Sequence, residues 1–305
     1  MTFAALPDLP SHPCYLNGAF TALNEAKVSV LDRGFIFGDG VYEVLPVYGG
    51  RAFRFDQHMA RLDRSLAEMR IANPHSHAAW QQIATDLIAA CAAFPWAIGP
   101  KGIKNEPVMA DLLVYLQVTR GVAVRDHVMP QHTTPTVFAM CNPLTPASAA
   151  ARAQGVACVT HADFRWQKAH IKSTSLLGSV MARQLSFDAG AAETIMFRGD
   201  LLSEAAASNV WVVNNGVVSG PPKDNLVLEG IRYGLIQELC AAQGIGFSLR
   251  PITREEVLGC DELMLSSATK EVLAVTTLDD RKVGTGLPGP VYQALYAAYQ
   301  AAKMA

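Results

Sequence analysis

Strand-like and helix-like stretches follow one another in mixed order along this chain, and that order limits the folds open to it. Residues 14–20 and 26–32 alternate apolar and polar side chains, with an Asn17-Gly18 pair inside the first stretch. This is the pattern of short strands and a hairpin turn, and it returns at residues 41–55. From Asp56 onward, apolar residues recur at three- and four-residue steps, which predicts a helix with Asp56 as its N-cap.

The rest of the chain continues the mixture. A second helix is predicted at residues 78–93, and further helices at residues 175–189, 230–243 and 290–303. The remaining stretches with strand character are residues 111–121, 136–142, 155–161, 192–198, 209–215, 262–267 and 272–278. Because a strict βαβ series would alternate single strands with single helices, this order predicts an α+β fold instead.

The length of 305 residues suggests two domains of roughly 150 residues each. Residues 141–150 combine two prolines with several small side chains, which is typical of a linker. We therefore expect an N-terminal α+β domain at residues 1–140 and a C-terminal domain at residues 151–305. Residues 94–107 hold three prolines and two glycines, and we expect them to form an irregular surface loop.

Charge and hydropathy exclude several classes of protein. The formal net charge is −2, without the basic excess of a nucleic-acid-binding protein. Only 17% of the residues are charged and 50% are apolar, which predicts a large core, a buried subunit interface, or both. The N-terminus lacks the pattern of a signal peptide, and no stretch is apolar enough to span a membrane. We expect a soluble cytoplasmic protein with no nucleic-acid partner and no membrane association.

The cysteines and histidines do not indicate a metal centre. None of the six cysteines forms a CxxC pair, so we expect most of them to be buried, inert thiols. The closest histidine pair, His75 and His77, could bind a metal, but no carboxylate or cysteine completes a ligand set. A solvated turn is the better interpretation, and we predict no metal site.

A lysine before an apolar helix is the first candidate for chemistry. Lys172 lies in KAHIKSTSLLGSVMARQ, with few acidic residues nearby. Desolvation lowers the pKa of a lysine amine, and the neutral amine is the nucleophile that forms Schiff bases. From these residues alone, a surface lysine at a helix start is the simpler interpretation, and Lys168 would serve equally well.

Two segments could bind an anion. A loop leads to Gly230 and then to an amphipathic helix, whose first N–H groups could donate to a phosphate. Residues 266–271, with the sequence SSATKE, offer hydroxyl and amide groups after a strand. Either segment could instead be an ordinary helix start or a polar turn.

Two further groups of residues carry charge beside apolar strands. Glu204 lies between a strand and a run of small residues, and it would need a cationic partner if it were buried. Arg120, Arg125 and His127 follow a buried strand, and an arginine there could bind a carboxylate through two hydrogen bonds. A solvated glutamate and a solvated basic loop are the alternatives.

Taken in order, these weak signals resemble one known family. The chain carries DRGFIFGDGVYEVLPVYGG, HMARL, VTRGVAVRDHVMP, HIKSTSLLGSVMARQ, LLSEAAASNVWVVNNG, NLVLEGIRYG and LMLSSATKEVLAV. Over about residues 15 to 290 this series resembles the class IV, or fold type IV, pyridoxal-phosphate aminotransferases, and within them the D-amino-acid enzymes. The resemblance implies a smaller N-terminal α/β domain and a larger C-terminal pseudo-barrel domain that carries the cofactor lysine. It also implies pyridoxal 5'-phosphate as cofactor, amino acid and 2-oxo acid substrates, and a homodimer.

The family's site residues can be transferred one by one. The resemblance places the lysine that binds the cofactor covalently at Lys172 and the carboxylate at the ring nitrogen at Glu204. The other implied residues are Arg61, Ile231, Arg232, Ser267, Ala268 and Thr269 for the phosphate, Leu228 for the cofactor ring, and Tyr42, Arg125 and His127 for the substrate carboxylate. The Arg-x-His element favours D-amino acids such as D-alanine, because branched-chain L-amino-acid enzymes usually lack it.

The chain also departs from the family pattern. Arg232 replaces a threonine, residues 205–207 are three alanines where glycine and serines are usual, and Ala268 replaces another threonine. Alternatives with the same fold are a branched-chain L-amino-acid or (R)-amine transaminase and an aminodeoxychorismate lyase. A binding protein without catalysis is the alternative from a different class.

Overall fold

The computed structural model describes residues 10–94 and 111–304. The chain divides into two compact units. The first contains the residues up to Thr145 together with Lys172–Ser175, and the second contains Pro146–Ile171 and the residues from Leu176 onward. The predicted loop at residues 94–107 lies outside the described residues, apart from Phe94.

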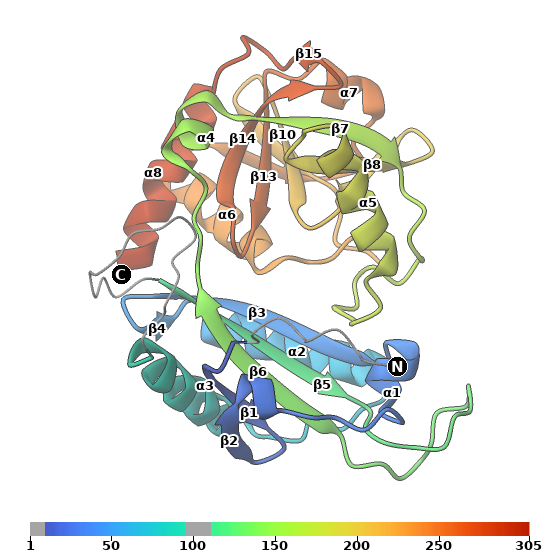
Figure 1. Ribbon diagram of the computed structural model, residues 1–305. Helices are drawn as coiled ribbons and strands as arrows, with labels where there is room; N and C mark the ends of the chain where they lie inside the picture. The colour runs from blue at the N-terminus through green and yellow to red at the C-terminus, as the bar shows by residue number, and fades with distance from the viewer. Residues whose placement is uncertain (1–9, 95–110, 305) are drawn as a thin grey trace. The chain divides into compact units, whose positions relative to one another are not determined.

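The first unit is built on an antiparallel sheet with the order β2-β1-β6-β5-β3-β4. Its strands are β1 (Pro13–Leu16), β2 (Ala19–Ala22), β3 (Gly40–Tyr48), β4 (Arg51–Ala52), β5 (Leu112–Thr119) and β6 (Thr136–Pro143). Its helices are the 3-10 turn η1 (Leu23–Glu25), α1 (Arg33–Phe37), α2 (Phe55–Glu68) and α3 (His77–Ala92). The two long helices α2 and α3 cover one face of this sheet (Figure 1).

Local sequence explains most of these boundaries. Asn17 and Gly18 both have positive φ, 49° and 99°, and form the predicted hairpin turn between β1 and β2. The prediction of a strand at residues 26–32 is wrong, because Val28 and Val30 are 52% and 70% exposed and the segment forms no ladder. The prediction of Asp56 as N-cap is also wrong: Arg54, with φ 57°, is the N-cap of α2, and Asp56 lies in the first turn.

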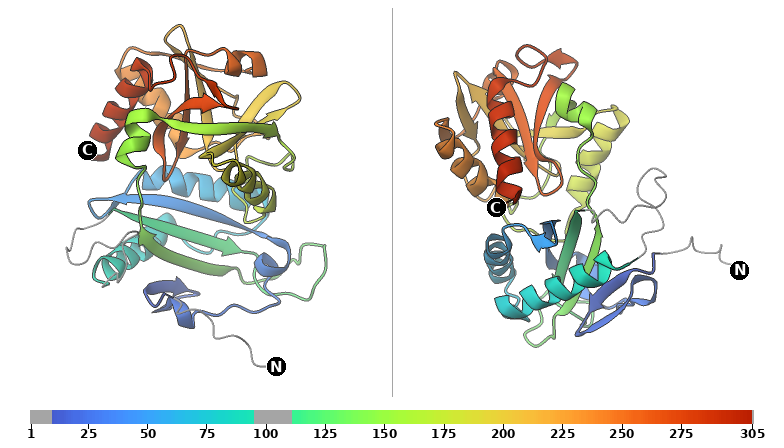
Figure 2. Two further views of the ribbon diagram at one scale, coloured as in Figure 1. Left: turned by 45° about the horizontal axis from the view of Figure 1, so that its top comes forward. Right: turned by 90° about the vertical axis from the view of Figure 1, so that its left-hand side faces the viewer.

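The second unit is built on a nine-stranded sheet with the order β12-β11-β10-β13-β14-β7-β8-β9 and β15 paired to β14. Its strands are β7 (Val156–Ala162), β8 (Glu193–Arg198), β9 (Leu201–Ala205), β10 (Asn209–Asn214), β11 (Val217–Gly220), β12 (Gly246–Leu249), β13 (Glu262–Ser267), β14 (Glu271–Leu278) and β15 (Arg281–Lys282). Its helices are α4 (Ala149–Gln154), α5 (Leu177–Asp188), α6 (Ile231–Ala242), α7 (Arg254–Leu258) and α8 (Pro290–Met304). Helix α8 runs along β13 and β14 (Figure 2).

This second sheet is curled. Strand β9 ends the strand order, yet its chain turns directly into the inner strand β10, where Ala205 N–H donates to the Ser208 carbonyl at 2.8 Å. The side of the sheet enclosed by this curl is apolar, with Ile195, Val210 and Leu263 almost fully buried in one cluster. The end of β9 is therefore held by a packed core, and Glu204 lies on this strand.

The position of Lys172 differs from its predicted domain. Lys172 carbonyl accepts from Tyr42 N–H at 3.0 Å, and Thr174 N–H donates to Gly40 carbonyl at 2.9 Å. Residues 172–174 thus extend the sheet of the first unit along the start of β3, instead of belonging to the C-terminal domain. The segment without secondary structure is also shorter than the predicted linker at residues 141–150, because Cys141–Pro143 continue β6 and α4 begins at Ala149.

Candidate active site

The backbone of Lys172 is fixed on both sides within the first unit. Its carbonyl is bound by β3, and its N–H donates to Ser65 Oγ on α2 at 3.2 Å. The side chain is half-buried, and its Nζ lies 4.2 Å from the centre of the Tyr42 ring. The structure therefore brings together Lys172 and Tyr42, two of the predicted site residues, and holds the amine over an aromatic face.

Tyr42 belongs to an aromatic surface on the side of the sheet opposite to α2. Its ring stacks on Tyr115 with centroids 5.6 Å apart, and Tyr115 Oη donates to Gln117 Oε1 at 2.6 Å. Burial, followed by the proximity of Tyr42, raises the pKa of Tyr115 to about 12. Tyr115 is thus a neutral hydrogen-bonding phenol at physiological pH.

Arg61 lies on α2 one turn before Ser65, on the same side of the helix. Its Nε and Nη2 each donate to the Glu43 carboxylate at 2.7 Å, and His58 Nδ1 lies 2.7 Å from the same carboxylate. Although burial alone would raise the pKa of Glu43, the ion pair with Arg61 holds it far below its usual range. Glu43 and His58 were not predicted, and they fix the orientation of Arg61.

Arg125 and His127 are both exposed and lie beside the same ring. The guanidinium of Arg125 is 5.4 Å from the centre of Phe37, and the imidazole of His127 is 5.5 Å from it. The structure brings these two residues together around the end of α1. Arg120 is instead buried, and it donates to Asp39 at 2.7 and 3.0 Å, which makes it part of the framework.

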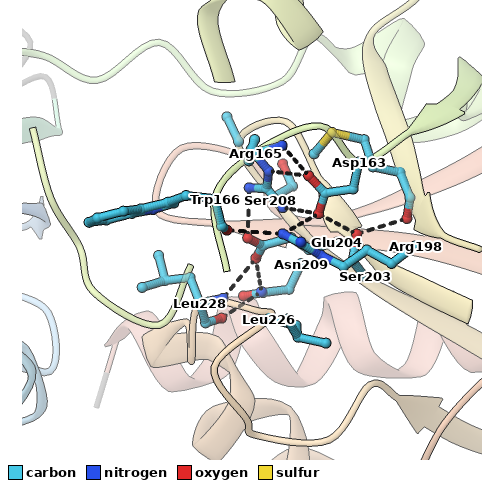
Figure 3. A network of polar contacts seen from close by, with 12 residues as sticks. Asp163, Arg165, Trp166, Arg198, Ser203, Glu204, Ser208, Asn209, Leu226 and Leu228 are labelled. Atoms are coloured by element: carbon cyan, nitrogen blue, oxygen red, sulfur yellow. Dashed lines mark hydrogen bonds and ion pairs between the residues drawn. The ribbon is translucent and has the colours of Figure 1, made fainter. Parts of the chain in front are cut away.

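Glu204 is buried in the second unit and is surrounded by donors (Figure 3). Its Oε1 accepts from Arg165 Nη1 at 2.8 Å, and its Oε2 accepts from Leu228 N–H at 3.1 Å and Asn209 Nδ2 at 3.2 Å. Burial raises the pKa of Glu204 to about 6, against the opposing effect of Arg165. The cationic partner that a buried Glu204 requires is therefore Arg165.

Sequence reasoning missed Arg165 and its neighbour Asp163. These residues follow β7 at a bend, where Arg165 N–H donates to Asp163 Oδ1 at 3.0 Å. The pairing of β8 with both β7 and β9 brings this bend close to Glu204. A spacing of two residues is that of an Asx turn, in which an aspartate side chain accepts from the backbone two residues on. That spacing was visible in DFRW, but the strand pairing that makes it relevant was not.

The segment before α6 contributes backbone groups. Leu228 donates its N–H to Glu204 and accepts from Asn209 Nδ2 at 2.9 Å through its carbonyl. A Cβ at Gly230 would lie 2.0 Å from Asn209 Oδ1, so a larger residue there would displace the Asn209 amide that donates to Glu204. Ile231 begins α6 directly after this glycine, and the N–H groups of a helix start can bind an anion.

Arg232 directs its side chain away from this helix start. Its Nε and Nη2 donate to Tyr299 Oη on α8 at 3.2 and 2.8 Å, and the side chain is fully buried. Only its backbone is placed to meet an anion at the start of α6. The arginine that replaces the family's threonine therefore joins α6 to α8.

The predicted cradle at Ser267, Ala268 and Thr269 is the turn between β13 and β14. Ser267 Oγ lies 3.4 Å from Thr269 Oγ1 and accepts from Lys270 N–H at 3.1 Å. The hydroxyls are thus gathered at one turn. Lys270 Nζ contacts the buried Glu193 at 3.2 Å.

The described residues also bear on metal sites, membrane-spanning helices and disulfides. Within residues 10–94 and 111–304, no group of three or more histidine, cysteine or acidic side chains is arranged to hold a metal. The helices of these same residues include none with the length and hydropathy of a membrane span. All six cysteines are buried and form no disulfide.

Comparisons with known proteins agree on one family. The family model for amino-transferase class IV matches residues 40–278. The D-alanine aminotransferase of Bacillus licheniformis is 35% identical over 284 residues, which cover 93% of this chain and 94% of that protein. The D-alanine aminotransferase of Listeria innocua is 33% identical, and the match covers 92% of each chain.

Solved structures share the fold at lower identity. The branched-chain amino acid aminotransferase of Escherichia coli matches with a TM-score of 0.84 and 22% identity, over 95% of this chain and 94% of that one. The T.th. branched-chain amino acid aminotransferase, solved with pyridoxamine 5'-phosphate, matches with a TM-score of 0.84 and 20% identity, over 96% and 94% of the two chains. At such identities the likeness concerns the fold alone.

Proposed function

Because the chain belongs to the class IV aminotransferases, we propose that it transfers the amino group of a D-amino acid, such as D-alanine, to a 2-oxo acid such as 2-oxoglutarate. The comparisons confirm the predicted α+β fold of type IV, an aminotransferase activity and pyridoxal 5'-phosphate as the cofactor. Specificity for D-amino acids is supported by the D-alanine aminotransferases that are 35% and 33% identical.

The residues present fit this cofactor. The amine of Lys172 can bind the cofactor's aldehyde, and the buried carboxylate of Glu204, with a pKa near the physiological range, can bind its ring nitrogen. The start of α6 after Gly230 can bind its phosphate. When bound, the cofactor supplies an electron sink for the negative charge that develops at the substrate Cα.

The fixed backbone of Lys172 is the observation that carries this proposal. Hydrogen bonds to Tyr42 and Ser65 fix its position in the chain, while its half-buried amine lies over the Tyr42 ring. We assign Lys172 the covalent attachment of the cofactor and, once its amine is released, the movement of the proton at the substrate Cα.

Glu204 holds the proton of the ring nitrogen in this assignment. An ionised carboxylate favours a protonated partner, and burial strengthens that interaction because water does not screen it. Donors from Arg165, Asn209 and Leu228 keep the carboxylate oriented. Loss of this charge removes the support for a protonated ring.

The remaining predicted residues are assigned to the cofactor ring, the substrate carboxylate and the cofactor phosphate. Leu228 is assigned to pack against the cofactor ring. Tyr42, Arg125 and His127 are assigned to the substrate carboxylate. Phosphate binding is assigned to Arg61, the backbone of Ile231 and Arg232, and the turn formed by Ser267, Ala268 and Thr269.

A homodimer in the cytoplasm completes the proposal. Helix α5 exposes Leu177, Val180 and Met181 by 73%, 61% and 55%, and Val180 and Met181 follow Leu177 by three and four positions, on the same side of the helix. Such an apolar face supports the proposal that a second copy of the chain packs against α5. The molecular mass measured by light scattering tests whether the protein is a dimer. Six buried cysteines that form no disulfide favour a reducing compartment.

A donor panel tests the proposed activity. Purified protein is supplied with 2-oxoglutarate and with D-alanine, L-alanine, L-leucine or (R)-1-phenylethylamine, and formation of glutamate is measured. We expect transfer from D-alanine in preference to the other donors. Preference for L-leucine or the amine would reject D-specificity. In a separate reaction with aminodeoxychorismate and no 2-oxo acid, repeated release of pyruvate would indicate a lyase.

A further inference from the structure

Asp163 has no role in the assignments above, although its side chain is fully buried at the centre of a polar network (Figure 3). Its Oδ1 accepts from Arg165 Nε at 3.0 Å, and its Oδ2 accepts from Arg165 Nη2 at 2.9 Å. The same Oδ2 accepts from Ser203 Oγ at 2.9 Å and lies 3.1 Å from Arg198 Nη2. Asp163 thus binds Arg165 through two parallel hydrogen bonds.

This arrangement divides the guanidinium of Arg165 between two carboxylates. One edge, formed by Nε and Nη2, is taken by Asp163, and Nη1 alone reaches Glu204. A guanidinium binds a carboxylate most strongly through two N–H groups at once. Because Asp163 occupies the fork, Glu204 receives a single hydrogen bond from Arg165.

The charges of the network balance only with Asp163 ionised. Asp163 and Glu204 are negative, and Arg165 and Arg198 are positive. Without the charge of Asp163, Arg165 and Arg198 would both lose the carboxylate that they share in this network. Arg165 would then gain by turning its fork toward Glu204, and the carboxylate would lose its capacity to accept a further donor.

We propose that Asp163 is a positioning residue that holds Arg165 by one edge and so keeps Glu204 able to accept a hydrogen bond from the ring nitrogen of the cofactor. This inference rests on the proposed role of Glu204. Asp163 acts mainly through Arg165, because its direct charge effect on Glu204 is smaller than that of Arg165, and most of its effect on cofactor binding should therefore disappear when Arg165 is absent.

A double-mutant cycle tests this dependence. The dissociation constant of pyridoxal 5'-phosphate is measured by fluorescence titration of the apo-protein for wild type, Asp163→Asn, Arg165→Met and the double variant. We expect Asp163→Asn to weaken binding about tenfold, the effect of losing one hydrogen bond to a charged group. In the Arg165→Met background, the same change should alter binding by less than about twofold.

Matched controls separate this effect from a loss of folding. Asp188→Asn, on the exposed side of α5, should bind the cofactor as wild type does. Melting temperatures show whether each variant is folded. Asp163→Ser carries the same prediction if Asp163→Asn does not fold, because it removes the charge without placing amide donors against Arg165.

Two results overturn the inference. Wild-type cofactor affinity in Asp163→Asn would show that Arg165 needs no restraint. An undiminished effect in the Arg165→Met background would show that Asp163 does not act through Arg165. If instead Glu204→Gln binds the cofactor as tightly as wild type, the proposed role of Glu204 fails first, and the donor panel tests the activity separately.

Discussion

The burial of Glu204 should be measurable as a dependence of apo-protein stability on pH. Its pKa in the folded chain is raised from 4.5 to about 6. For an acid with a raised folded pKa, stability is fully present below the unfolded pKa and is lost as pH rises through the folded pKa. A rise of about 1.5 pKa units corresponds to about 2 kcal/mol, lost mainly between about pH 4.5 and pH 6.

Glu204→Gln removes this titration while keeping the size of the side chain. The free energy of unfolding of the two apo-proteins is measured in urea at several values between pH 4 and pH 8. We expect wild type to lose about 2 kcal/mol relative to Glu204→Gln across that interval, with no further change above about pH 7. A constant difference would refute a raised pKa, and a difference of opposite sign would show that Arg165 outweighs burial.

Three further predictions concern the surroundings of the site. Gly230→Ala should weaken binding of pyridoxal 5'-phosphate to the apo-protein, because its Cβ would lie 2.0 Å from Asn209 Oδ1; unchanged affinity by fluorescence titration would contradict this geometry. Arg232→Ala should cost about 1–3 kcal/mol of stability by removing the guanidinium that donates to buried Tyr299 Oη, whereas the KM for D-alanine should stay near that of wild type. Arg125→Ala should raise the KM for D-alanine by at least about tenfold through loss of a charge-assisted contact, and an unchanged kcat/KM would remove Arg125 from substrate binding.

The elements that the sequence predicts correctly are those governed by local patterns. The hairpin at Asn17-Gly18 and the helices α2 and α3 follow from turn residues and from apolar periodicity. The segment at residues 26–32 misleads because Val28 and Val30 alternate like a strand but remain exposed. Tertiary contacts and partner molecules decide whether an apolar side chain is buried, and the alternation of residues in the sequence carries no information about either.

The site divides in the same way. Motif order indicates Lys172 and Glu204, but it does not indicate that Lys172 pairs with β3 or that Arg165 reaches Glu204. Those contacts depend on strand register between segments far apart in the chain. For Arg232, the position in the motif predicts contact with the cofactor phosphate, whereas the side chain donates to Tyr299 Oη.

Reduction with borohydride tests the central assignment most directly. The protein loaded with pyridoxal 5'-phosphate is reduced, digested and analysed by mass spectrometry, alongside Lys172→Ala and the neighbouring control Lys168→Ala. We predict a phosphopyridoxyl modification on Lys172 in wild type and in Lys168→Ala, and no modification and no transfer from D-alanine in Lys172→Ala. A modification on Lys168 in wild type, or activity retained by Lys172→Ala, would contradict the assignment.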